Sequence, residues 1–437
     1  MWSRDVSLAM VVKMNIHELL EKWTSVFCEY SYNNERYAQL CLHLTLGQIY
    51  KLRFIIKGAQ KLDGRINIAA FWDASGGKSA PYGFVKDMLV SAGKEVRDLD
   101  DFTDAALIGT WRDAEEDEED EAEGGMILEP GILQISDVLH FDEASTLFME
   151  TQHTKKAINF LEKALNPIGS AHSLISKKLA RGPPIEFYTQ LSLYLTTYIP
   201  ENIGQEFLNK GLMQRTLVLP KRLSFADRVD NLRLDVDKLG KVTVAPELYE
   251  SIKTDIVRLA REESVRLSSE PHELDWDNVR EYVKNRAVRL LMMTQSLDAG
   301  VQSVATSLIA RYTNFMYVIA MHACSVRGDR VITRDDVDYA YEFIHTIMEH
   351  VLPWLEMDSG ITRKDAKEEK LKAQLRKIAS QLLELSPRDD GLVLKSNLWK
   401  KAEADLKISQ PTLYRQTKDA AWLHEQTIKR KKYVRVE

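Results

Sequence analysis

The feature that most constrains the fold is a set of short apolar segments that alternate with helical segments in the first half of the chain. The first runs from 66 to 71 and leads through a glycine-rich turn into a predicted helix at about 81–92. Further apolar runs lie at 138–141, 191–195 and 216–219. Such runs are typical of strands buried on both faces. Strands alternating with helices predict an α/β fold with a mainly parallel sheet.

The rest of the chain is predicted to be mostly helical. Apolar spacing predicts helix within residues 14–60 and across 245–356, with strong helices at 304–325 and 334–348. Thr333 is the expected cap of the last of these, because acidic residues follow it in the first turn. The predicted domains are an N-terminal helical segment, an α/β core, an all-α lid and a C-terminal DNA-binding domain, at 1–60, 61–225, 226–360 and 361–437.

Composition excludes several classes of protein. The 437 residues carry a net charge of -6, so any surface for nucleic acid must be local. Three scattered cysteines argue against a zinc site and against a disulfide framework. No apolar run approaches the roughly 18 residues of a membrane helix, and no signal peptide is evident. We therefore expect a cytoplasmic protein without a membrane or zinc partner.

The glycine-rich turn after the first strand is a candidate phosphate-binding loop. A strand, a glycine-rich turn and a helix N-terminus together present backbone N–H groups to phosphate. Lys78 would reach the terminal phosphates and Ser79 would ligate Mg²⁺. The residues expected to bind the nucleotide in this loop are Asp73, Ser75, Gly76, Gly77, Lys78 and Ser79.

Two acids end the apolar run at 138–141. Asp142 is placed to hold Mg²⁺, and Glu143 to polarise an attacking water molecule. Solvated acids are common at strand ends, so this pair carries little weight alone. In the order glycine-rich loop, strand and acid pair, the two motifs favour hydrolysis of ATP with Mg²⁺ as cofactor.

These motifs resemble the motor part of the minichromosome maintenance helicases, a family of AAA+ ATPases. Residues 72–79 align without a gap with that family's Gly-Asp-Pro-Gly-Thr-Ala-Lys-Ser. Residues 128–143 resemble its Glu-Ala-Gly-Ala-Leu run and the acidic strand end. Residues 159–178 resemble its helix and pre-sensor hairpin, 212–216 its Leu-Leu-Ser-Arg-Phe-Asp, and 331–337 its Val-Thr-x-x-Asp-Val.

The resemblance implies an AAA+ P-loop core with an all-α lid and a C-terminal winged helix. It also implies a homo-oligomeric ring, typically a hexamer, that acts on DNA. Lys178, or its neighbour Lys177, would grip DNA. Thr197 occupies the position of the first nucleotide sensor. Arg215 would be the arginine finger that reaches the neighbouring subunit's nucleotide, and Arg311 the second sensor, which contacts the nucleotide.

Three features depart from the family pattern. Trp72 stands where the loop has its first glycine. We expect this chain to lack the family's N-terminal oligonucleotide-binding and zinc region. An acidic tract at 115–123 lies where the family inserts its helix-2 hairpin. Its seven successive acids repel one another, so we expect a solvated loop or hairpin tip that repels DNA phosphate.

The C-terminal segment from 392 onward predicts a winged helix. Helix 394–406, a turn at 407–408 and a second helix capped by Ser409 form the expected helix-turn-helix, and 427–435 alternates like a wing strand. A protein-docking module with a basic tail is the alternative to a DNA-binding one. The residues expected to contact DNA here are Arg415, Lys418, Lys429, Arg430, Lys431 and Lys432.

Some conspicuous residues are better explained by packing. The aromatic residues of helix 304–325 are expected in the core, and His322 is expected to be a hydrogen-bonded packing histidine. Cys324 is expected to be a small buried residue. Pro353, followed by Trp354, predicts a helix stop.

These patterns leave three functions open. The first is an ATP-dependent DNA helicase or translocase that works as a ring in DNA replication. The second is a nucleotide-binding switch or scaffold with weak hydrolysis, which Trp72 and the acidic tract favour. The third is an origin-binding initiator of a mobile element.

Overall fold

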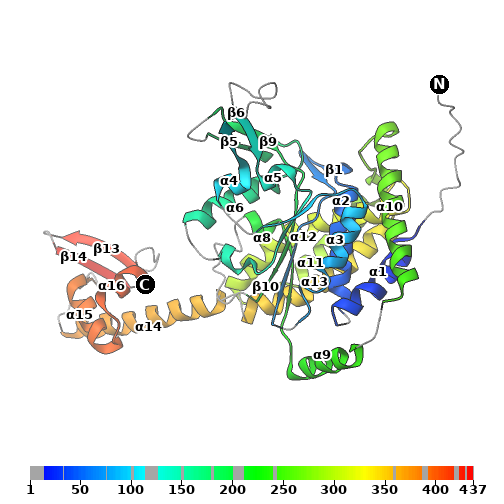
Figure 1. The fold of residues 1–437 in the computed structure, drawn as a ribbon. Helices are drawn as coiled ribbons and strands as arrows, with labels where there is room; N and C mark the ends of the chain where they lie inside the picture. The colour runs from blue at the N-terminus through cyan, green and yellow to red at the C-terminus, as the bar shows by residue number, and fades with distance from the viewer. Residues whose placement is uncertain are drawn as a thin grey trace, which may run out of the picture. The chain divides into compact units, whose positions relative to one another are not determined.

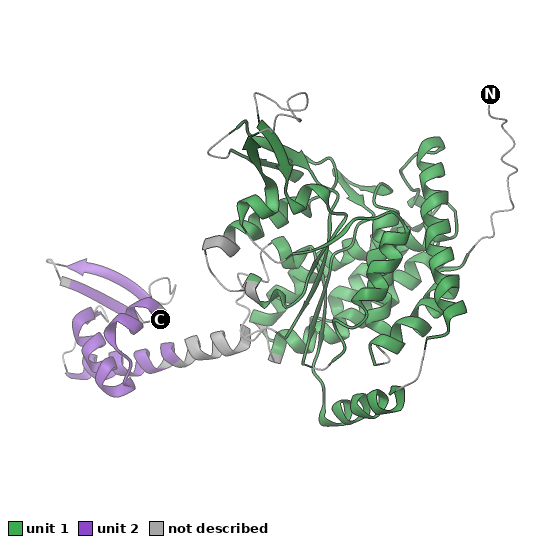
Figure 2. Cartoon of the chain, in the orientation of Figure 1, with its two compact units in different colours: residues 1–359 green, residues 360–437 purple. Residues whose placement is uncertain are grey.

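The structure, a computed structural model, describes most of the chain. The described residues are 14–32, 34–74, 76–99, 103–113, 126–148, 152–178, 182–199, 211–239, 244–357, 361–385, 392–417, 423–428 and 431–436. The chain forms two compact units, residues 1–359 and 360–437 (Figure 2). The segments predicted as N-terminal segment, core and lid all fall in the first unit.

A five-stranded parallel sheet forms the centre of the first unit (Figure 1). Its strands are β3 (Ile68–Trp72), β4 (Val96–Asp98), β7 (Val138–Phe141), β10 (Ser192–Thr197) and β11 (Leu217–Lys221). Their order across the sheet is β11-β3-β10-β7-β4. β3, β7 and β10 are buried along their whole length, which explains their apolar sequences. The predicted α/β fold with a parallel sheet is confirmed.

The path of the chain through this sheet brings three segments to one edge. After β3 the chain moves to the edge strand β4 and returns through β7 and β10, so β10 lies between β3 and β7. It then passes to the other side of β3 as β11. Because the strands are parallel, the segments that follow β3, β7 and β10 meet at the carboxyl edge. This is where the strand order reverses and where sheets of this kind bind ligands.

Helices cover both faces of the sheet (Figure 1). α2 (Glu35–Ile49) packs on β3 and β10 and is buried from its third residue onward. α3 (Tyr82–Ser91) follows β3 as predicted, and α13 (Arg334–Met357) packs on β11. On the opposite face, the 3-10 segment η2 (Ala144–Phe148) packs on β10 and contacts α6 (Gln152–Ala164).

The other helices lie mostly around this core. The region 245–356 is helical as predicted, and the aromatic residues expected in the core of α12 are buried. The remaining helices of the unit are α1 (Ile16–Tyr30), α4 (Asp104–Ile108), α5 (Ile132–Ile135), η3 (Ala171–Ser173), α8 (Gly211–Gln214), α9 (Phe225–Lys238), α10 (Pro246–Ser269), η4 (Asp277–Val279), α11 (Arg280–Met292) and α12 (Ala299–Val326).

The start of α13 agrees with the sequence, but its end does not. The backbone N–H of Thr333 donates to Asp336 Oδ2 at 2.8 Å, and that of Asp336 donates to Thr333 Oγ1 at 3.4 Å, which forms a capping box. The predicted stop at Pro353 is wrong, because α13 continues through it for another turn. Trp354 is buried, with its ring 5.7 Å from that of Phe71 in β3, so packing on the sheet outweighs the lost helical hydrogen bond.

The prediction that helix extends to residue 60 is wrong in its last part. After α2 the chain forms an antiparallel hairpin of β1 (Phe54–Lys57) and β2 (Gln60–Asp63). Gly58 in the turn has a φ of +60°, a conformation that glycine adopts without strain. These residues form strands because the two segments pair with each other, and apolar spacing does not reveal such pairing.

Two further hairpins extend from the connections between the core strands. β5 (Gly109–Asp113) pairs with β6 (Met126–Pro130), and β8 (Leu174–Lys177) pairs with β9 (Ile185–Tyr188), both antiparallel. The acidic tract 115–123 lies outside the described residues, in the segment that joins β5 to β6. The sequence predicted a loop or hairpin tip at this position.

A chain of buried polar side chains joins α2 to α12 and α13. The Nδ1 atoms of His43 and His322 are 3.1 Å apart, and His43 Nε2 is 2.9 Å from the Tyr339 hydroxyl. His322 Nε2 is 2.7 Å from the Gly64 carbonyl, which can only accept, so His322 carries its proton on Nε2. Its Nδ1 then accepts from His43 Nδ1, and His43 Nε2 accepts from Tyr339. His322 is thus a hydrogen-bonded packing histidine, as predicted.

Both histidines are neutral in the folded protein. Burial holds the pKa of His43 well below its ordinary value, and the neighbouring His322 adds to this effect. Burial lowers the pKa of His322 to about 4. Protonation of either ring would put a charge into the core and remove an acceptor from the chain of hydrogen bonds.

The second unit is a small helical module with a three-stranded sheet. The sheet has the order β12-β14-β13 and is antiparallel. Its core contains Leu398, Trp399, Leu413 and Val434. The predicted single strand 427–435 is instead the end of one strand and most of the next. The elements of the second unit are α14 (Ile361–Leu385), β12 (Val393–Leu394), α15 (Lys395–Leu406), α16 (Gln410–Thr417), β13 (Leu423–Ile428) and β14 (Lys431–Val436).

Candidate nucleotide site and basic pocket

The loop after β3 is tight and depends on glycine at two positions. Gly77 has a φ of +75°, and a Cβ atom there would lie 2.7 Å from Cδ2 of Tyr32. A Cβ atom at Gly76 would lie 3.1 Å from the carbonyl oxygen of Asp73. Only glycine allows this path without strain. Ser75 lies outside the described residues.

Trp72 lies under this loop. It is the last residue of β3 and fully buried, and its Nε1 donates to the Leu219 carbonyl at 3.0 Å. Its ring packs 4.8 Å from that of Tyr37. A Cβ atom at Gly76 would meet the indole Cε3 at 3.2 Å, so the loop rests on the indole. The indole therefore fills space that a glycine would leave open.

Asp142, directly after β7, is the centre of a hydrogen-bonded cluster. Its Oδ1 accepts from Ser79 Oγ at 3.0 Å, from Thr196 Oγ1 at 2.6 Å and from the backbone N–H of Glu143 at 3.1 Å. Partial burial acts to raise the pKa of Asp142, but the hydrogen bonds from Thr196 and Ser79 outweigh it and hold the pKa below its ordinary value. Asp142 is therefore ionised at neutral pH.

Thr196, and not Thr197, is the β10 residue that contacts Asp142. Successive side chains of a strand point to opposite faces, so only one of the two threonines reaches the cluster. Thr197 is fully buried, and its Oγ1 has no hydrogen-bond partner in the part of the chain that the structure describes. Thr197, the residue that the resemblance offers as first nucleotide sensor, therefore does not contact Asp142.

Glu143 occupies an unusual backbone conformation. Its φ is +52°, in the left-handed region, which costs a residue with a side chain about 1–2 kcal/mol. Its side chain is exposed beside the Asp142 cluster. Strain of this kind is concentrated at functional sites, and here it sets the direction of a carboxylate next to the cluster.

Lys78 is held at the site by its backbone and by an aromatic ring. The Tyr37 hydroxyl donates to the Lys78 carbonyl at 2.7 Å, and Lys78 Nζ lies 3.9 Å from the centre of the Tyr198 ring. Burial lowers the pKa of Lys78, and the carboxylates of Asp142 and Glu143 counteract part of this shift. The ammonium group of Lys78 would have to leave the ring of Tyr198 to reach an incoming anion.

Asp73 links the loop to the segment after β11. Its Oδ2 accepts from the backbone N–H of Leu223 at 3.0 Å and forms an ion pair with Arg228 of α9, also at 3.0 Å. The first residue of the loop is therefore tied to α9 by a carboxylate.

Arg215 and Arg311 lie at the amino edge of the sheet, opposite Lys78. Asn67, which precedes β3, donates to the Arg215 carbonyl at 2.7 Å, whereas Lys78 follows β3. Both arginines line a pocket of about 630 Å³ at this edge. Burial lowers the pKa of Arg215, and Arg311 lowers it further. Within one chain, neither arginine meets the loop that contains Lys78.

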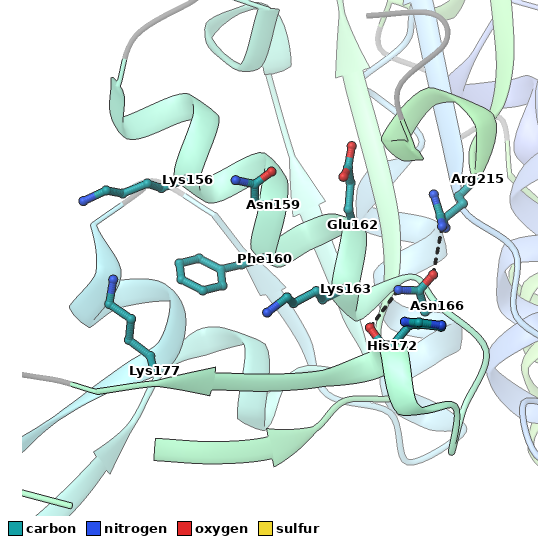
Figure 3. A pocket seen from close by; sticks show the side chains of 9 residues that line it. All are labelled: Lys156, Asn159, Phe160, Glu162, Lys163, Asn166, His172, Lys177 and Arg215. Carbon is teal, nitrogen blue, oxygen red and sulfur yellow. Dashed lines mark hydrogen bonds between the residues drawn. The ribbon is translucent and has the colours of Figure 1, made fainter. Parts of the chain in front are cut away.

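A basic pocket of about 670 Å³ opens beside Arg215 (Figure 3). Lys156 and Lys163 from α6 and Lys177 from β8 line it together with Arg215, and among the described residues that line it Glu162 is the only carboxylate. Arg215 donates to Asn166 Oδ1 at 2.9 Å, which fixes its guanidinium at the pocket wall. The balance of charge suits an anionic ligand.

The side chain of Arg65 holds the segment that positions Arg215. Its guanidinium donates to both oxygens of Asp63, at 2.9 and 3.0 Å. It also donates to three backbone carbonyls, one of them that of Asn166 at 2.6 Å. Asn166 in turn binds Arg215. No local pattern in the sequence singles out Arg65, because these carbonyls lie between 99 and 126 residues away along the chain.

The candidate DNA contacts are only partly described. Lys177 forms an ion pair with Asp104 at 2.9 Å, and Lys178, the next residue, is exposed. In the second unit the side chains of Arg415 and Lys432 are exposed. The remaining candidates lie outside the described residues or have undescribed side chains, namely Lys418, Lys429, Arg430 and Lys431.

The residues at the carboxyl edge fit a nucleoside triphosphate and Mg²⁺ in most respects. Gly76 and Gly77 leave the backbone uncovered, and Lys78 supplies a cation. The Ser79 hydroxyl and the ionised Asp142 are oxygen ligands of the kind that Mg²⁺ binds. The buried indole under the loop does not follow the phosphate-loop pattern.

No protein-family model matches the chain, and no match was found among curated proteins. In the part of the chain that the structure describes, no helix is long and apolar enough to cross a membrane. No group of three or more His, Cys, Asp or Glu side chains there is arranged to hold a metal ion.

Proposed function

We propose that this protein is an AAA+ ATPase that acts as a ring on DNA, in the manner of the helicases it resembles. The observation that carries the proposal is the cluster of Ser79, Asp142 and Thr196, contributed by three segments that meet beside the glycine loop. The strand order supports it, because β10 lies between the loop strand and the acid strand.

The geometry supports a division of labour at the carboxyl edge. Lys78 would bind the terminal phosphates, and Ser79 and Asp142 would hold Mg²⁺. The ion would neutralise charge on the phosphates. Thr196 would keep Asp142 ionised and oriented, while the exposed carboxylate of Glu143 would orient the attacking water and accept its proton.

The opposite edge supports assembly from several copies. Arg215 lies at the amino edge with its guanidinium fixed by Asn166, too far from Lys78 to serve the same nucleotide. In a head-to-tail ring it would reach the terminal phosphate bound by the next subunit. The lysines of the basic pocket would add to the positive potential there.

Two features support DNA as the partner. The β8–β9 hairpin presents Lys177 and Lys178, as the resemblance implies for a hairpin that grips DNA. The second unit runs helix, strand, helix, helix, strand, strand, which is the order of a winged helix, with α16 in the place of a recognition helix. Arg415 on α16 and Lys432 on the hairpin are exposed for phosphate contact.

A specific observation favours a second function, a nucleotide-binding switch with weak hydrolysis. The indole of Trp72 fills the space under Gly76, and Lys78 Nζ lies over a tyrosine ring. Both would slow formation of a productive phosphate cradle without preventing binding. The proposal of an origin-binding initiator has no comparable support.

The test is ATP hydrolysis by the full chain, with and without single-stranded DNA. We expect turnover that DNA stimulates and that Glu143→Gln abolishes. Thr196→Val should reduce turnover about 10- to 100-fold, because a hydrogen bond to a charged group is worth about 1.5–3 kcal/mol. Thr197→Val, the matched control, should retain it.

Each outcome has a defined meaning. Equal turnover in wild type and Glu143→Gln would contradict the ATPase proposal. Tight ATP binding that Lys78→Ala abolishes, without turnover in wild type, would favour the switch.

A further inference from the structure

Helix α9 carries an apolar stripe that the described part of its own chain leaves largely exposed. Its apolar side chains recur at alternating intervals of four and three residues, the spacing of a coiled-coil seam. Phe225 is 83% exposed and Leu239, just after the helix, is 74% exposed. Figure 1 shows α9 set apart from the helices that cover the sheet. The stripe consists of Phe225, Val229, Leu232, Val236 and Leu239.

The helix is attached to its own chain by its polar side. Arg228 pairs with Asp73 at 3.0 Å, Asp235 accepts from a tyrosine hydroxyl, and Lys238 pairs with a glutamate at 3.2 Å. No residue of α9 is buried. At 100° per residue these polar positions all lie to one side of the apolar stripe, between about 60° and 140° from its centre. An amphipathic helix normally buries its apolar face, so this arrangement indicates a partner.

A second exposed apolar patch lies on α11. Val288, Leu291 and Met292 share one face of that helix and are between 43% and 56% exposed. Both surfaces are exposed, so α9 and α11 do not cover each other within one chain. Each is a helix face, and helix faces pack into one another through side-chain ridges and grooves.

Among the described residues, an unpaired acid beside one surface and an unpaired base beside the other are complementary in charge. Asp237 flanks the α9 stripe and Arg289 flanks the α11 patch. Asp230 and Lys284 pair with Arg233 and Glu281 of their own helices. Asp237 and Arg289 are both exposed, and neither forms an ion pair within the described residues. Opposite charge around two apolar faces gives them a preferred register.

We propose that α9 of one copy of this chain docks on α11 of a second copy, with Asp237 close to Arg289. The two surfaces differ, so the contact is heterologous and each subunit offers one of each. Repetition of this contact produces a ring or an open filament. The proposal rests on the head-to-tail assembly proposed above, but it requires no nucleotide hydrolysis.

The docked helix would also connect subunits to the nucleotide loop. Arg228 of α9 pairs with Asp73, the first residue of that loop. A neighbour that grips the apolar stripe would therefore act on the loop through one ion pair. Docking of the neighbouring copy on α9 would therefore influence how the loop binds nucleotide.

The experiment measures the assembly of the full chain by sedimentation and mass photometry. Wild type should form species larger than a dimer as concentration rises. Leu232→Asp and Leu291→Asp should each weaken association by at least about 30-fold, as expected for a central apolar contact worth 2 kcal/mol or more. The control is Val265→Asp, which changes a 68% exposed valine on α10 and should assemble like wild type.

Mixing the two variants gives the sharpest result. A chain with an altered α9 still offers α11, and a chain with an altered α11 still offers α9. The mixture should therefore form dimers with one intact junction and nothing larger. Normal assembly of Leu291→Asp would overturn the proposal, as would a wild-type chain that stays monomeric at tens of micromolar.

A charge exchange keeps the proposal testable if an aspartate in the stripe harms folding. Asp237→Arg alone and Arg289→Asp alone should each weaken assembly about tenfold, and the double variant should recover it. No recovery would overturn the predicted register. A wild-type chain that assembles as expected but does not hydrolyse ATP would instead contradict the proposed function and leave this contact intact.

Discussion

Lowering the pH from 7.5 to 5.0 should destabilise the first unit through the buried pair of His43 and His322. An exposed histidine in the unfolded chain has a pKa of about 6.5, whereas burial lowers the pKa of His322 to about 4. Between these values the unfolded chain binds a proton that the folded chain does not. The free energy of unfolding therefore falls as the pH drops from about 6.5 to about 4.

The structure sets the size of this effect. A difference of about 2.5 pKa units corresponds to about 3 kcal/mol in full, of which about 2 kcal/mol is lost by pH 5.0. The pKa of His43 is also lowered by burial, so this residue acts in the same direction. The hydrogen bonds to Tyr339 and Gly64 fix the positions of the ring protons of the two histidines. Each ring nitrogen is then engaged in a hydrogen bond, and none is free to accept an additional proton.

The assay compares wild type with His322→Gln, whose amide can still donate to the Gly64 carbonyl. Urea unfolding at both pH values, followed by hydrogen exchange of α12 amides, reports on the first unit alone. Between pH 7.5 and 5.0 the free energy of unfolding should fall by about 2 kcal/mol more in wild type than in the variant. The histidines other than His43 keep their surroundings in both proteins, so their contributions cancel. Without His322 the pKa of His43 is lowered less, which adds to the difference in the same direction. Equal losses would refute the reasoning.

Three further substitutions test single contacts. Thr197→Val should leave the free energy of unfolding unchanged or raise it by up to about 1 kcal/mol, since the buried hydroxyl has no partner among the described residues; a clear loss in urea denaturation would contradict this. Gly77→Ala should weaken ATP binding measured by calorimetry, because its Cβ meets Tyr32; undiminished affinity would show that the loop tolerates a side chain. Glu263→Ala should cost about 3 kcal/mol, because it removes the carboxylate that accepts from buried Arg53 at 2.7 Å and leaves the more distant Glu270, at 3.8 Å, to balance that charge; an unchanged melting temperature would count against it.

Four of the five strands of the sheet were predictable because nearly all of their residues are buried. The edge strand β4, of whose three residues only Val96 is buried, was not predicted. The run 138–141 matches β7 residue for residue, since no polar alternation interrupts it. The capping box of Thr333 was equally visible, because a cap is a local pattern of side chain and backbone.

The details that failed depend on contacts made far along the chain. Thr196 and Thr197 are equivalent in sequence, and only the direction of β10 relative to Asp142 distinguishes them. Pro353 lies within a helix because Trp354 packs on the sheet, which no local rule states.

The residues of the candidate site also fall into those that a local pattern predicts and those that only distant contacts reveal. The glycine loop and the acid pair follow from spacing, but Arg65 does not, because its carbonyl partners are distant in sequence. The exposed stripe of α9 has an ordinary amphipathic pattern. Only the structure reveals that its polar side faces the protein.

The placement of Lys78 and Arg215 at opposite edges of the sheet has a kinetic consequence under the proposed function. One chain would bind a nucleotide but lack the arginine that completes the site. At concentrations below the dissociation constant of the assembly, the initial rate would then rise with the square of protein concentration. The amount of protein in a cell, rather than the supply of nucleotide, would set the threshold for activity.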